Sequence, residues 1–323
     1  MKIEVIYLLS AFILTAILGK IFIPILKKLK VGQNEREEGP RSHLKKKGTP
    51  TMGGIMMIIS IVIFTGISLL FIRDNQILIP LISIALTTVG FGIVGFIDDF
   101  KKVVLKNTEG LNPKLKMLGL LIISTLYTLF LVKYSGISTE IIIPFLKVSI
   151  LLPIYIYIPF TILVMLSSTN AVNLTDGVDG LAGSVSAIMI TTVSVIAIKL
   201  GYAGISIFGA IVVGSIIGFL IYNFHKAKVM MGDTGSLLLG GALSSMAIYL
   251  KLPLILLIVA IVPILETLSV ILQVLYFRKT GKRLFRMSPL HHHFELTGWR
   301  ENKVVGVFSL ITLIASIISV FAI

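Results

Sequence analysis

The chain has no cysteine among its 323 residues. This absence excludes a disulfide framework and any metal site built on thiolates, so a bound metal must be held by oxygen or imidazole ligands. Charged residues are also scarce, at 14% of the chain, whereas 56% of the residues are hydrophobic and the mean hydropathy is +1.01. This composition excludes an ordinary soluble domain and predicts a polytopic membrane protein.

Apolar runs of about 20 residues recur along the whole chain, which is the length that crosses a bilayer as an α-helix. We therefore expect an all-α membrane protein with about ten transmembrane helices. Because these spans leave only loops, residues 1–323 are predicted to form a single integral-membrane domain. The predicted spans are 3–25, 52–72, 77–97, 115–133, 150–169, 181–199, 204–222, 236–250, 252–277 and 303–323. The ninth is expected to be broken or bent, because Pro253 and Pro263 lie within or beside it.

Lysine and arginine are distributed very unevenly between the two sides of this arrangement. One set of loops holds 22 of these residues and the opposite set holds 5. The basic set comprises 26–50, 98–116, 170–180, 223–235 and 278–303. Because positive charge is retained in the cytoplasm, these loops are predicted to be cytoplasmic and both termini extracytoplasmic. The net charge of +14 also favours contact with anionic membrane lipids.

Five of the six aspartates lie in three short polar islands, each at the mouth of a predicted span. The islands contain Asp98 with Asp99, Asp176 with Asp179, and Asp233. All three fall in predicted cytoplasmic loops, so they can converge at one membrane face. An acidic cluster of this kind can hold Mg²⁺ against a diphosphate, which indicates phosphoryl-transfer chemistry at a bilayer surface.

Two of the islands are open to a plainer interpretation when each is considered alone. The Asp98–Asp99 pair could be a solvated acidic helix end, although Lys101 or Lys102 could equally supply a cation or a phosphate contact. Asp233 lies between two glycines at a predicted helix start and would by itself be an ordinary N-cap. Their combination with the other islands is what favours a functional site.

The second island, Asn170–Gly183, holds two amides, two carboxylates and three glycines between apolar spans. Glycines permit close approach of the backbone, and a helix beginning near Leu181 would offer free N–H groups to an anion. The stretch partly resembles a calcium loop, but it lacks the bidentate glutamate twelve residues from the first ligand. We interpret it as an oxygen-lined loop beside an anionic substrate.

Histidines and one glutamate complete the candidate residues. The run His291–His293 lies in the last predicted cytoplasmic loop. Three successive histidines on a helix cannot all face one metal, so we expect one or two to contact phosphate or sugar, with a structural helix start as the alternative. Glu266 lies within the ninth span and either has a function or faces a neighbouring helix or a water-filled cleft.

The three islands and the histidine run, in this order on a chain with about ten spans, resemble the polyprenyl-phosphate N-acetylhexosamine-1-phosphate transferases. Lys46–Gly54 and Met287–Glu295 resemble more specifically the phospho-N-acetylmuramoyl-pentapeptide transferase family. The resemblance covers nearly the full length, and its motifs, although short, are jointly specific.

That family implies a Mg²⁺-dependent reaction in a bacterial cytoplasmic (inner) membrane, with the active site on the cytoplasmic face. Undecaprenyl phosphate takes phospho-MurNAc-pentapeptide from UDP-MurNAc-pentapeptide, which releases UMP and forms lipid I in the first membrane step of peptidoglycan synthesis. A homodimer is plausible for the family, and no nucleic-acid partner is expected.

The resemblance also implies a role for each matching residue. Asp98 and Asp99 would be an acid–base pair near the lipid phosphate, Asp233 the principal metal ligand, and Asp176 a catalytic and metal-binding residue beside the diphosphate. The implied substrate contacts are Lys46, Asn170, Asn173, Asp179, Asn223, Gln273, His292 and His293. The chain departs from the family at Lys226 and Met230, where proline and phenylalanine are usual, and loss of the ring would weaken stacking on uracil.

Three alternatives stay open at this point. The lipid phosphate could attack directly or through a covalent aspartyl phospho-enzyme, and we favour direct attack because it needs one fewer buried displacement. A sister enzyme that transfers GlcNAc-1-phosphate to a polyprenyl carrier would share the aspartates, but Gly48–Gly54 and Met287–Glu295 argue against it. A secondary transporter would place its acids near the membrane midplane between repeated halves, and no repeat is visible here.

Overall fold

The computed structural model describes residues 2–28, 48–103 and 110–323. Over these residues the chain is almost entirely helical, which confirms the all-α expectation. The exception is a hairpin of β1 (Glu140–Ile143) and β2 (Val148–Leu151), which pair antiparallel. Helices suit these apolar sequences because a helix satisfies every backbone polar group within its own segment.

The helices match the predicted spans in order. They are α1 (Lys2–Lys28), α3 (Gly54–Phe71), α4 (Asn75–Val103), α5 (Pro113–Lys133), α6 (Ile154–Thr175), α7 (Leu181–Lys199), α8 (Ala203–Asn223), α9 (Gly232–Tyr249), the 3₁₀-helix η1 (Pro253–Ile255), α10 (Leu256–Val259), α11 (Ile261–Thr280), α12 (Leu290–Leu296) and α13 (Glu301–Phe321). Among the described residues, nine helices are long and apolar enough to cross a membrane.

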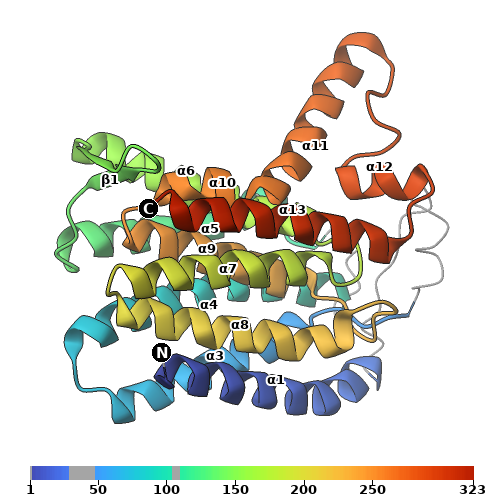
Figure 1. The fold of residues 1–323 in the computed structure, drawn as a ribbon. Helices are drawn as coiled ribbons and strands as arrows, with labels where there is room; N and C mark the ends of the chain where they lie inside the picture. The colour runs from blue at the N-terminus through green and yellow to red at the C-terminus, as the bar shows by residue number, and fades with distance from the viewer. Residues whose placement is uncertain (1, 29–47, 104–109) are drawn as a thin grey trace.

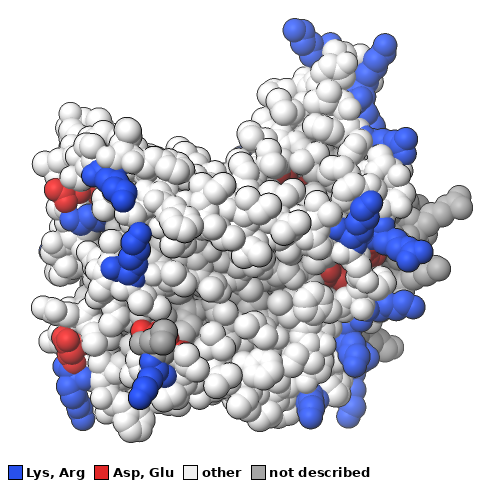
Figure 2. Space-filling view, viewed as in Figure 1, with Lys and Arg blue, Asp and Glu red and all other residues white. Residues whose placement is uncertain are grey.

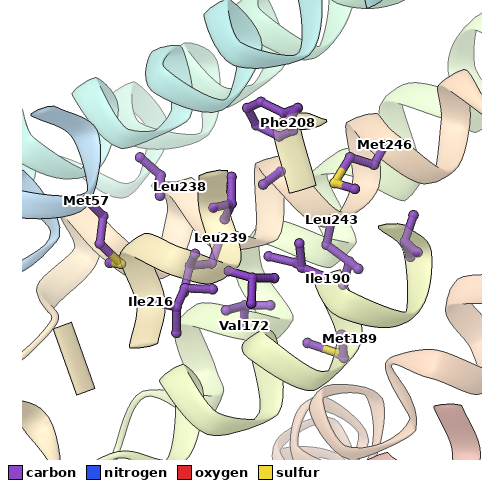
Figure 3. Packing of buried hydrophobic residues seen from close by; sticks show 14 of the residues in the cluster. Met57, Val172, Met189, Ile190, Phe208, Ile216, Leu238, Leu239, Leu243 and Met246 are labelled. Atoms are coloured by element: carbon purple, nitrogen blue, oxygen red, sulfur yellow. The ribbon is translucent and has the colours of Figure 1, made fainter. Parts of the chain in front are cut away.

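Helix α9 is the predicted span that falls outside these nine. Its sequence is rich in glycine, serine and threonine, and every one of its residues except Asp233 is buried. Figure 3 shows why: Leu238, Leu239, Leu243 and Met246 of α9 lie among side chains from the surrounding helices. A helix enclosed by protein does not have to be hydrophobic on all sides, and small residues let its neighbours approach closely.

The predicted ninth span, 252–277, is divided into η1, α10 and α11. Pro253 begins η1, and Ala260 separates α10 from α11 with φ −95° and ψ 28°. Figure 1 shows α11 leaving the bundle at an angle to its neighbours. The first turns of α11 line a groove together with α6, and the rest of α11 extends away from the bundle.

The two ends of the chain lie at the same end of the bundle, opposite the end that carries α12 (Figure 1). Because the helices alternate in direction, the C-terminal ends of α4, α6 and α8 meet the N-terminal ends of α5, α7 and α9 at the α12 end, which we call the site end. Figure 2 shows charged side chains gathered at the two ends, with a nearly uncharged band between them. That band is the surface that lipid would cover.

Candidate active site

Close packing of α4 against α9 brings the first and third islands together. Gly95 of α4 lies against the backbone of Asp233, and a Cβ added at Gly95 would overlap the Asp233 carbonyl oxygen. Asp98 and Asp99 follow three and four residues later, so they lie on the same face of α4 one turn closer to the site end. Glycine at position 95 is therefore what allows the aspartates of both islands to meet.

Gly95→Ala is expected to lower both thermal stability and turnover. The new methyl group meets backbone that cannot rotate away, and overpacking of this kind costs about 1–3 kcal/mol. The matched control is Gly90→Ala on the same helix, where the nearest atoms to an added Cβ belong to Ile123 at 3.4 Å, an ordinary contact distance. A melting curve and a turnover assay on both variants check this, and equal behaviour of the two would contradict it.

Asp99 holds the start of α9. Its Oδ2 accepts hydrogen bonds from the Thr234 N–H at 2.9 Å and the Thr234 hydroxyl at 2.6 Å, and its Oδ1 accepts one from the Asp233 N–H at 3.2 Å. The first N–H groups of a helix have no partner within the helix, so a carboxylate from α4 satisfies them here. The structure thus shows Asp99 positioning Asp233, while its acid–base role stays a prediction.

Asp98 and Asp233 share two lysines. Nζ of Lys102 lies 2.6 Å from Oδ2 of Asp98 and 3.0 Å from Oδ2 of Asp233. Nζ of Lys116 lies 2.7 Å from Oδ2 of Asp233 and 3.6 Å from Oδ2 of Asp98. The Leu111 N–H donates to Oδ1 of Asp98 at 2.7 Å. Two carboxylates and two ammonium groups therefore form one compact network at the site end.

Lys116 is a residue that our sequence analysis missed as a member of the site. It lies in the first turn of α5, among the lysines that we interpreted as a topology signal. Its contact with Asp233 depends on how α5 packs beside α4 and α9, which spacing along the chain does not reveal. Lys102 was recognised as a nearby cation only for its own island, and its bond to Asp233 was not predicted.

The second island joins the network through Asn173, in the last turn of α6. Its Nδ2 donates to Oδ1 of Asp233 at 2.7 Å and to Oγ of Ser236 at 2.8 Å. Asp176 follows at the end of the same helix. Burial raises the pKa of Asp176 well above its usual range, and the negative charges of Asp233 and Asp99 raise it further. Asp176 is therefore close enough to the carboxylates of the other two islands to interact with them.

Three other predicted substrate residues make contacts within the protein. Asn170 donates from Nδ2 to the Leu166 carbonyl of its own helix at 2.7 Å. Asn223 accepts from the Gly180 N–H at 3.0 Å and donates to the Val229 carbonyl at 2.9 Å, so it joins the second island to the loop after α8. Asp179 accepts from the Ala227 N–H at 3.0 Å in the same loop.

Gln273, His292 and His293, which were also predicted to contact substrate, lie beside the loop between α11 and α12. Oε1 of Gln273 accepts from the N–H groups of Leu284 and Phe285 at 2.9 and 2.8 Å, and Nδ1 of His293 accepts from the Arg286 N–H at 3.2 Å. Nδ1 of His292 lies 2.9 Å from Oε2 of Glu295. These side chains shape the loop between α11 and α12. Lys46 lies outside the described residues.

Known proteins match this chain over nearly its full length, which includes the residues of this site. Residues 81–251 match the family described as Glycosyl transferase family 4. The phospho-N-acetylmuramoyl-pentapeptide-transferase of Halalkalibacterium halodurans is 46% identical over 317 residues, which cover 97% of this chain and 95% of the relative. The proteins of the same name from Clostridium perfringens strain 13 and Thermoanaerobacter sp. strain X514 are 49% and 47% identical, covering 94% and 97% of this chain and 93% and 96% of their own length.

The chain belongs to the phospho-N-acetylmuramoyl-pentapeptide-transferase family. This membership confirms the resemblance drawn from the three islands and the histidine run. It leaves the transporter interpretation without support, and it favours the pentapeptide transferase over the sister enzymes that use GlcNAc.

Of the two positions expected to depart from the family pattern, 226 and 230, the second holds a buried side chain. Met230 is 6% exposed, its N–H donates to the Pro50 carbonyl at 2.7 Å, and its carbonyl accepts from the Gly53 N–H at 3.0 Å. Position 230 therefore joins the segment before α3 to the segment before α9. It presents no aromatic ring on which a base could stack.

One further group in this transferase has the composition of a metal site. Ligand atoms of Asp179, His225 and Glu301 lie within 4.8 Å of one another, and this is the one such group of three among the residues that the structure describes. Mg²⁺ prefers oxygen ligands, whereas imidazole suits zinc, copper, iron and nickel. The predicted Mg²⁺ ligands Asp176 and Asp233 are not part of this group.

Proposed function

We propose that the protein transfers phospho-MurNAc-pentapeptide from UDP-MurNAc-pentapeptide to undecaprenyl phosphate, which yields lipid I and UMP. The observation that carries this proposal is the network that Asp98 and Asp233 form with Lys102 and Lys116. Asp99 caps the first turn of α9 and so holds Asp233 in this network. Full-length relatives bearing the name of this transferase support it. The enzyme is a sugar-phosphate transferase that carries out the first membrane step of peptidoglycan synthesis.

The two lysines suit the charge of this reaction. Phosphoryl transfer depends on positioning and on stabilising negative charge rather than on covalent chemistry by the protein. Each ammonium group has three N–H donors, so Lys102 and Lys116 can contact phosphate oxygens and keep bonds to the aspartates. Because α4, α5 and α9 fix both lysines, little reorganisation is needed when substrate binds.

Asp233 and Asp176 are the residues that we propose to hold Mg²⁺. Their carboxylates are the hard oxygen ligands that this ion prefers, and the charge of Asp233 contributes to the raised pKa of Asp176, so the two carboxylates are near one another. Asn173 donates to Oδ1 of Asp233 and so fixes the orientation of that carboxylate. When bound, Mg²⁺ would neutralise charge that develops on the diphosphate and on UMP as it leaves.

The contacts of Asp98 support direct attack by the lipid phosphate. Both of its oxygens are engaged, Oδ1 by the Leu111 N–H and Oδ2 by the two lysines, which lowers the nucleophilicity of the carboxylate. Asp99 is engaged in the same way by the start of α9. The lipid phosphate is already an anion, so Asp98 need only orient it or remove a residual proton.

The orientation in the membrane follows from charge. We propose that the site end is cytoplasmic and both termini are extracytoplasmic, because 22 lysines and arginines lie in the loops on that side against 5 on the other. The soluble nucleotide substrate then reaches the site from the cytoplasm. The division at Ala260 would make the ninth membrane crossing a broken helix. The homodimer stays a prediction.

A groove beside α6 suits the prenyl chain of the acceptor. It has a volume of about 300 Å³ and is lined mostly by apolar side chains of α6, η1, α10 and α11. Its lining includes Leu163, Ser167, Val172, Leu257 and Leu268. Val172 immediately precedes Asn173, which bonds to Asp233, so a chain in the groove would place its phosphate near the network. We propose that undecaprenyl phosphate enters here from the lipid.

Ser167→Trp is expected to raise KM for undecaprenyl phosphate by about tenfold, because the ring fills part of the groove and a tenfold change is about 1.4 kcal/mol. Ser167 is exposed, so its replacement leaves the packed interior intact. The matched control is Ile156→Trp, on an exposed α6 position outside the groove lining. Steady-state kinetics with each substrate varied in turn check this, and an unchanged KM for the lipid would contradict it.

Substrate choice tests the proposed function itself. Purified protein in detergent is mixed with Mg²⁺, undecaprenyl phosphate and either UDP-MurNAc-pentapeptide or UDP-GlcNAc, and UMP release is measured. Release only with the pentapeptide substrate is the expected result. UMP release with UDP-GlcNAc would overturn the assignment of the sugar. No UMP release with either substrate would overturn the proposal that the protein is a transferase.

A further inference from the structure

Glu266 and His291 form a buried pair between α11 and α12. Glu266 is 0% exposed and His291 is 1% exposed. The His291 N–H donates to Oε1 of Glu266 at 3.2 Å and lies 3.4 Å from Oε2, while Nδ1 of the imidazole lies 3.2 Å from Oε1. A glutamate within a membrane-spanning helix is costly, and one residue of α12 supplies contacts to both of its oxygens.

The other edge of the imidazole lies against the second island. A Cβ added at Gly177 would overlap Nε2 of His291, so the ring and the Gly177 backbone are in direct contact. Nε2 is buried and has no hydrogen-bond partner among the described residues. Gly177 directly follows Asp176, the residue that we propose to bind the metal with Asp233. The ring therefore fills the space between Glu266 of α11 and the turn that contains Asp176 and Gly177.

We propose that Glu266 is a positioning residue for the transfer reaction, which acts through His291 to fix the Asp176–Gly177 turn. This inference rests on the proposed function and adds to it a residue outside the three islands. Glu266 accepts a hydrogen bond from the backbone N–H of His291, and its Oε1 lies 3.2 Å from Nδ1, so the carboxylate lies against one edge of the buried ring. The ring then limits how far the turn can move away from Asp233.

A packing role alone would predict a different result from a positioning role. If Glu266 only filled space, its removal would lower stability and reduce the amount of folded enzyme without changing the folded enzyme's rate. If it positions Asp176, the folded enzyme should bind its nucleotide substrate and turn over slowly. A misplacement of about 1 Å at a reacting centre can cost on the order of 100-fold in rate.

The experiment compares Glu266→Ala and Glu266→Gln with wild type in the UMP-release assay, with melting curves and calorimetric titration of UDP-MurNAc-pentapeptide. Glu266→Ala is expected to lower kcat by about 10- to 100-fold with KM for the nucleotide substrate changed by less than about twofold. Glu266→Gln should restore much of the rate, because its Oε1 still accepts from the His291 N–H. The matched control is Ser269→Ala on the same helix, whose hydroxyl donates to the Glu266 carbonyl.

Each outcome decides the inference. Wild-type kcat in Glu266→Ala would overturn it while leaving the proposed function intact, and so would an equal loss in the alanine and glutamine variants that follows their melting temperatures. Absence of UMP release from the wild type would overturn the proposed function and the inference with it.

A second pair of variants tests the contact between the His291 ring and Gly177 directly. Gly177→Ala should destabilise the protein, because its methyl group meets the imidazole, and adding His291→Ala should restore the melting temperature by removing the ring. His291→Ala alone is expected to lower kcat, because the ring that limits the turn is lost, and the double variant should keep this low kcat. Recovery of wild-type kcat in the double variant would show that the ring has no positioning role.

Discussion

Asp233→Asn is expected to reduce turnover by at least about 100-fold, because stabilisation of developing charge by a bound cation is worth several kcal/mol. The neutral amide is a weaker ligand for Mg²⁺. It also removes one of the two carboxylates that Lys102 and Lys116 contact, which leaves them only Asp98. The measurement is UMP release together with binding of Mn²⁺, used in place of Mg²⁺ and followed by electron paramagnetic resonance. The variant should bind Mn²⁺ more weakly than the wild type.

The control for this variant is Asp74→Asn. Asp74 is the one aspartate outside the three islands, and it lies before α4 at the end of the bundle opposite the site. Its replacement removes the same charge and should leave turnover and Mn²⁺ affinity unchanged. Turnover close to wild type in Asp233→Asn, or loss of turnover with unaltered Mn²⁺ affinity, would contradict the role assigned to Asp233.

Asp98→Asn is expected to reduce kcat by about 100-fold or more, the usual contribution of a positioned acid–base group. Affinity for UDP-MurNAc-pentapeptide should stay close to wild type. The amide oxygen can still accept from the Leu111 N–H, and both lysines keep Asp233 as a partner, so the network around the nucleotide substrate is preserved. Calorimetric titration of the nucleotide substrate and single-turnover UMP release measure the two quantities separately.

A fall in nucleotide affinity that accounts for the whole loss of kcat/KM would contradict this assignment, because Asp98 would then contribute to binding of the UDP substrate. A reduced melting temperature would point instead to a structural role like that of Asp99. The two neighbours differ in their partners: Asp99 bonds to backbone N–H groups at the start of α9, whereas Asp98 faces the lysines and the Leu111 N–H.

The convergence of the islands could be predicted because it depends only on the number and order of the spans. Once the helices alternate in direction, residues at the ends of α4 and α6 and at the start of α9 must share one end of the bundle. Asp98, Asp99, Asn173 and Asp233 meet for this reason. The order of polar motifs along an apolar chain therefore contains most of the information about this part of the site.

The detailed partners could not be predicted, because they depend on packing between helices that are distant in sequence. Lys116 reaches Asp233 only because α5 lies beside α4 and α9, and Glu266 meets His291 only because the last loop folds back on α11. The central position of helix α9 could not be predicted from its sequence either. Its small residues make it a weak membrane span by composition, whereas the structure makes it the centre of the bundle.

Residues that bond to the loop between α11 and α12 were the hardest to interpret. Gln273 and His293 were expected to contact substrate, and the structure shows their side chains bonded to backbone between α11 and α12. Such bonds form wherever a turn leaves N–H groups unpaired, and spacing in the sequence gives no sign of them. Their substrate contacts stay predictions, which the kinetic constants of Gln273→Ala and His293→Ala can address.

The central claim is that one cation-dependent site joins the phospho-sugar to the lipid phosphate. The most direct measurement follows UMP and the lipid-linked product together in one reaction of the purified protein, before and after chelation with EDTA and after restoring Mg²⁺. The account predicts that UMP and lipid product form in equal amounts, stop with EDTA and resume with Mg²⁺. UMP release without a lipid-linked product, or equal formation of both in the presence of EDTA, would contradict it.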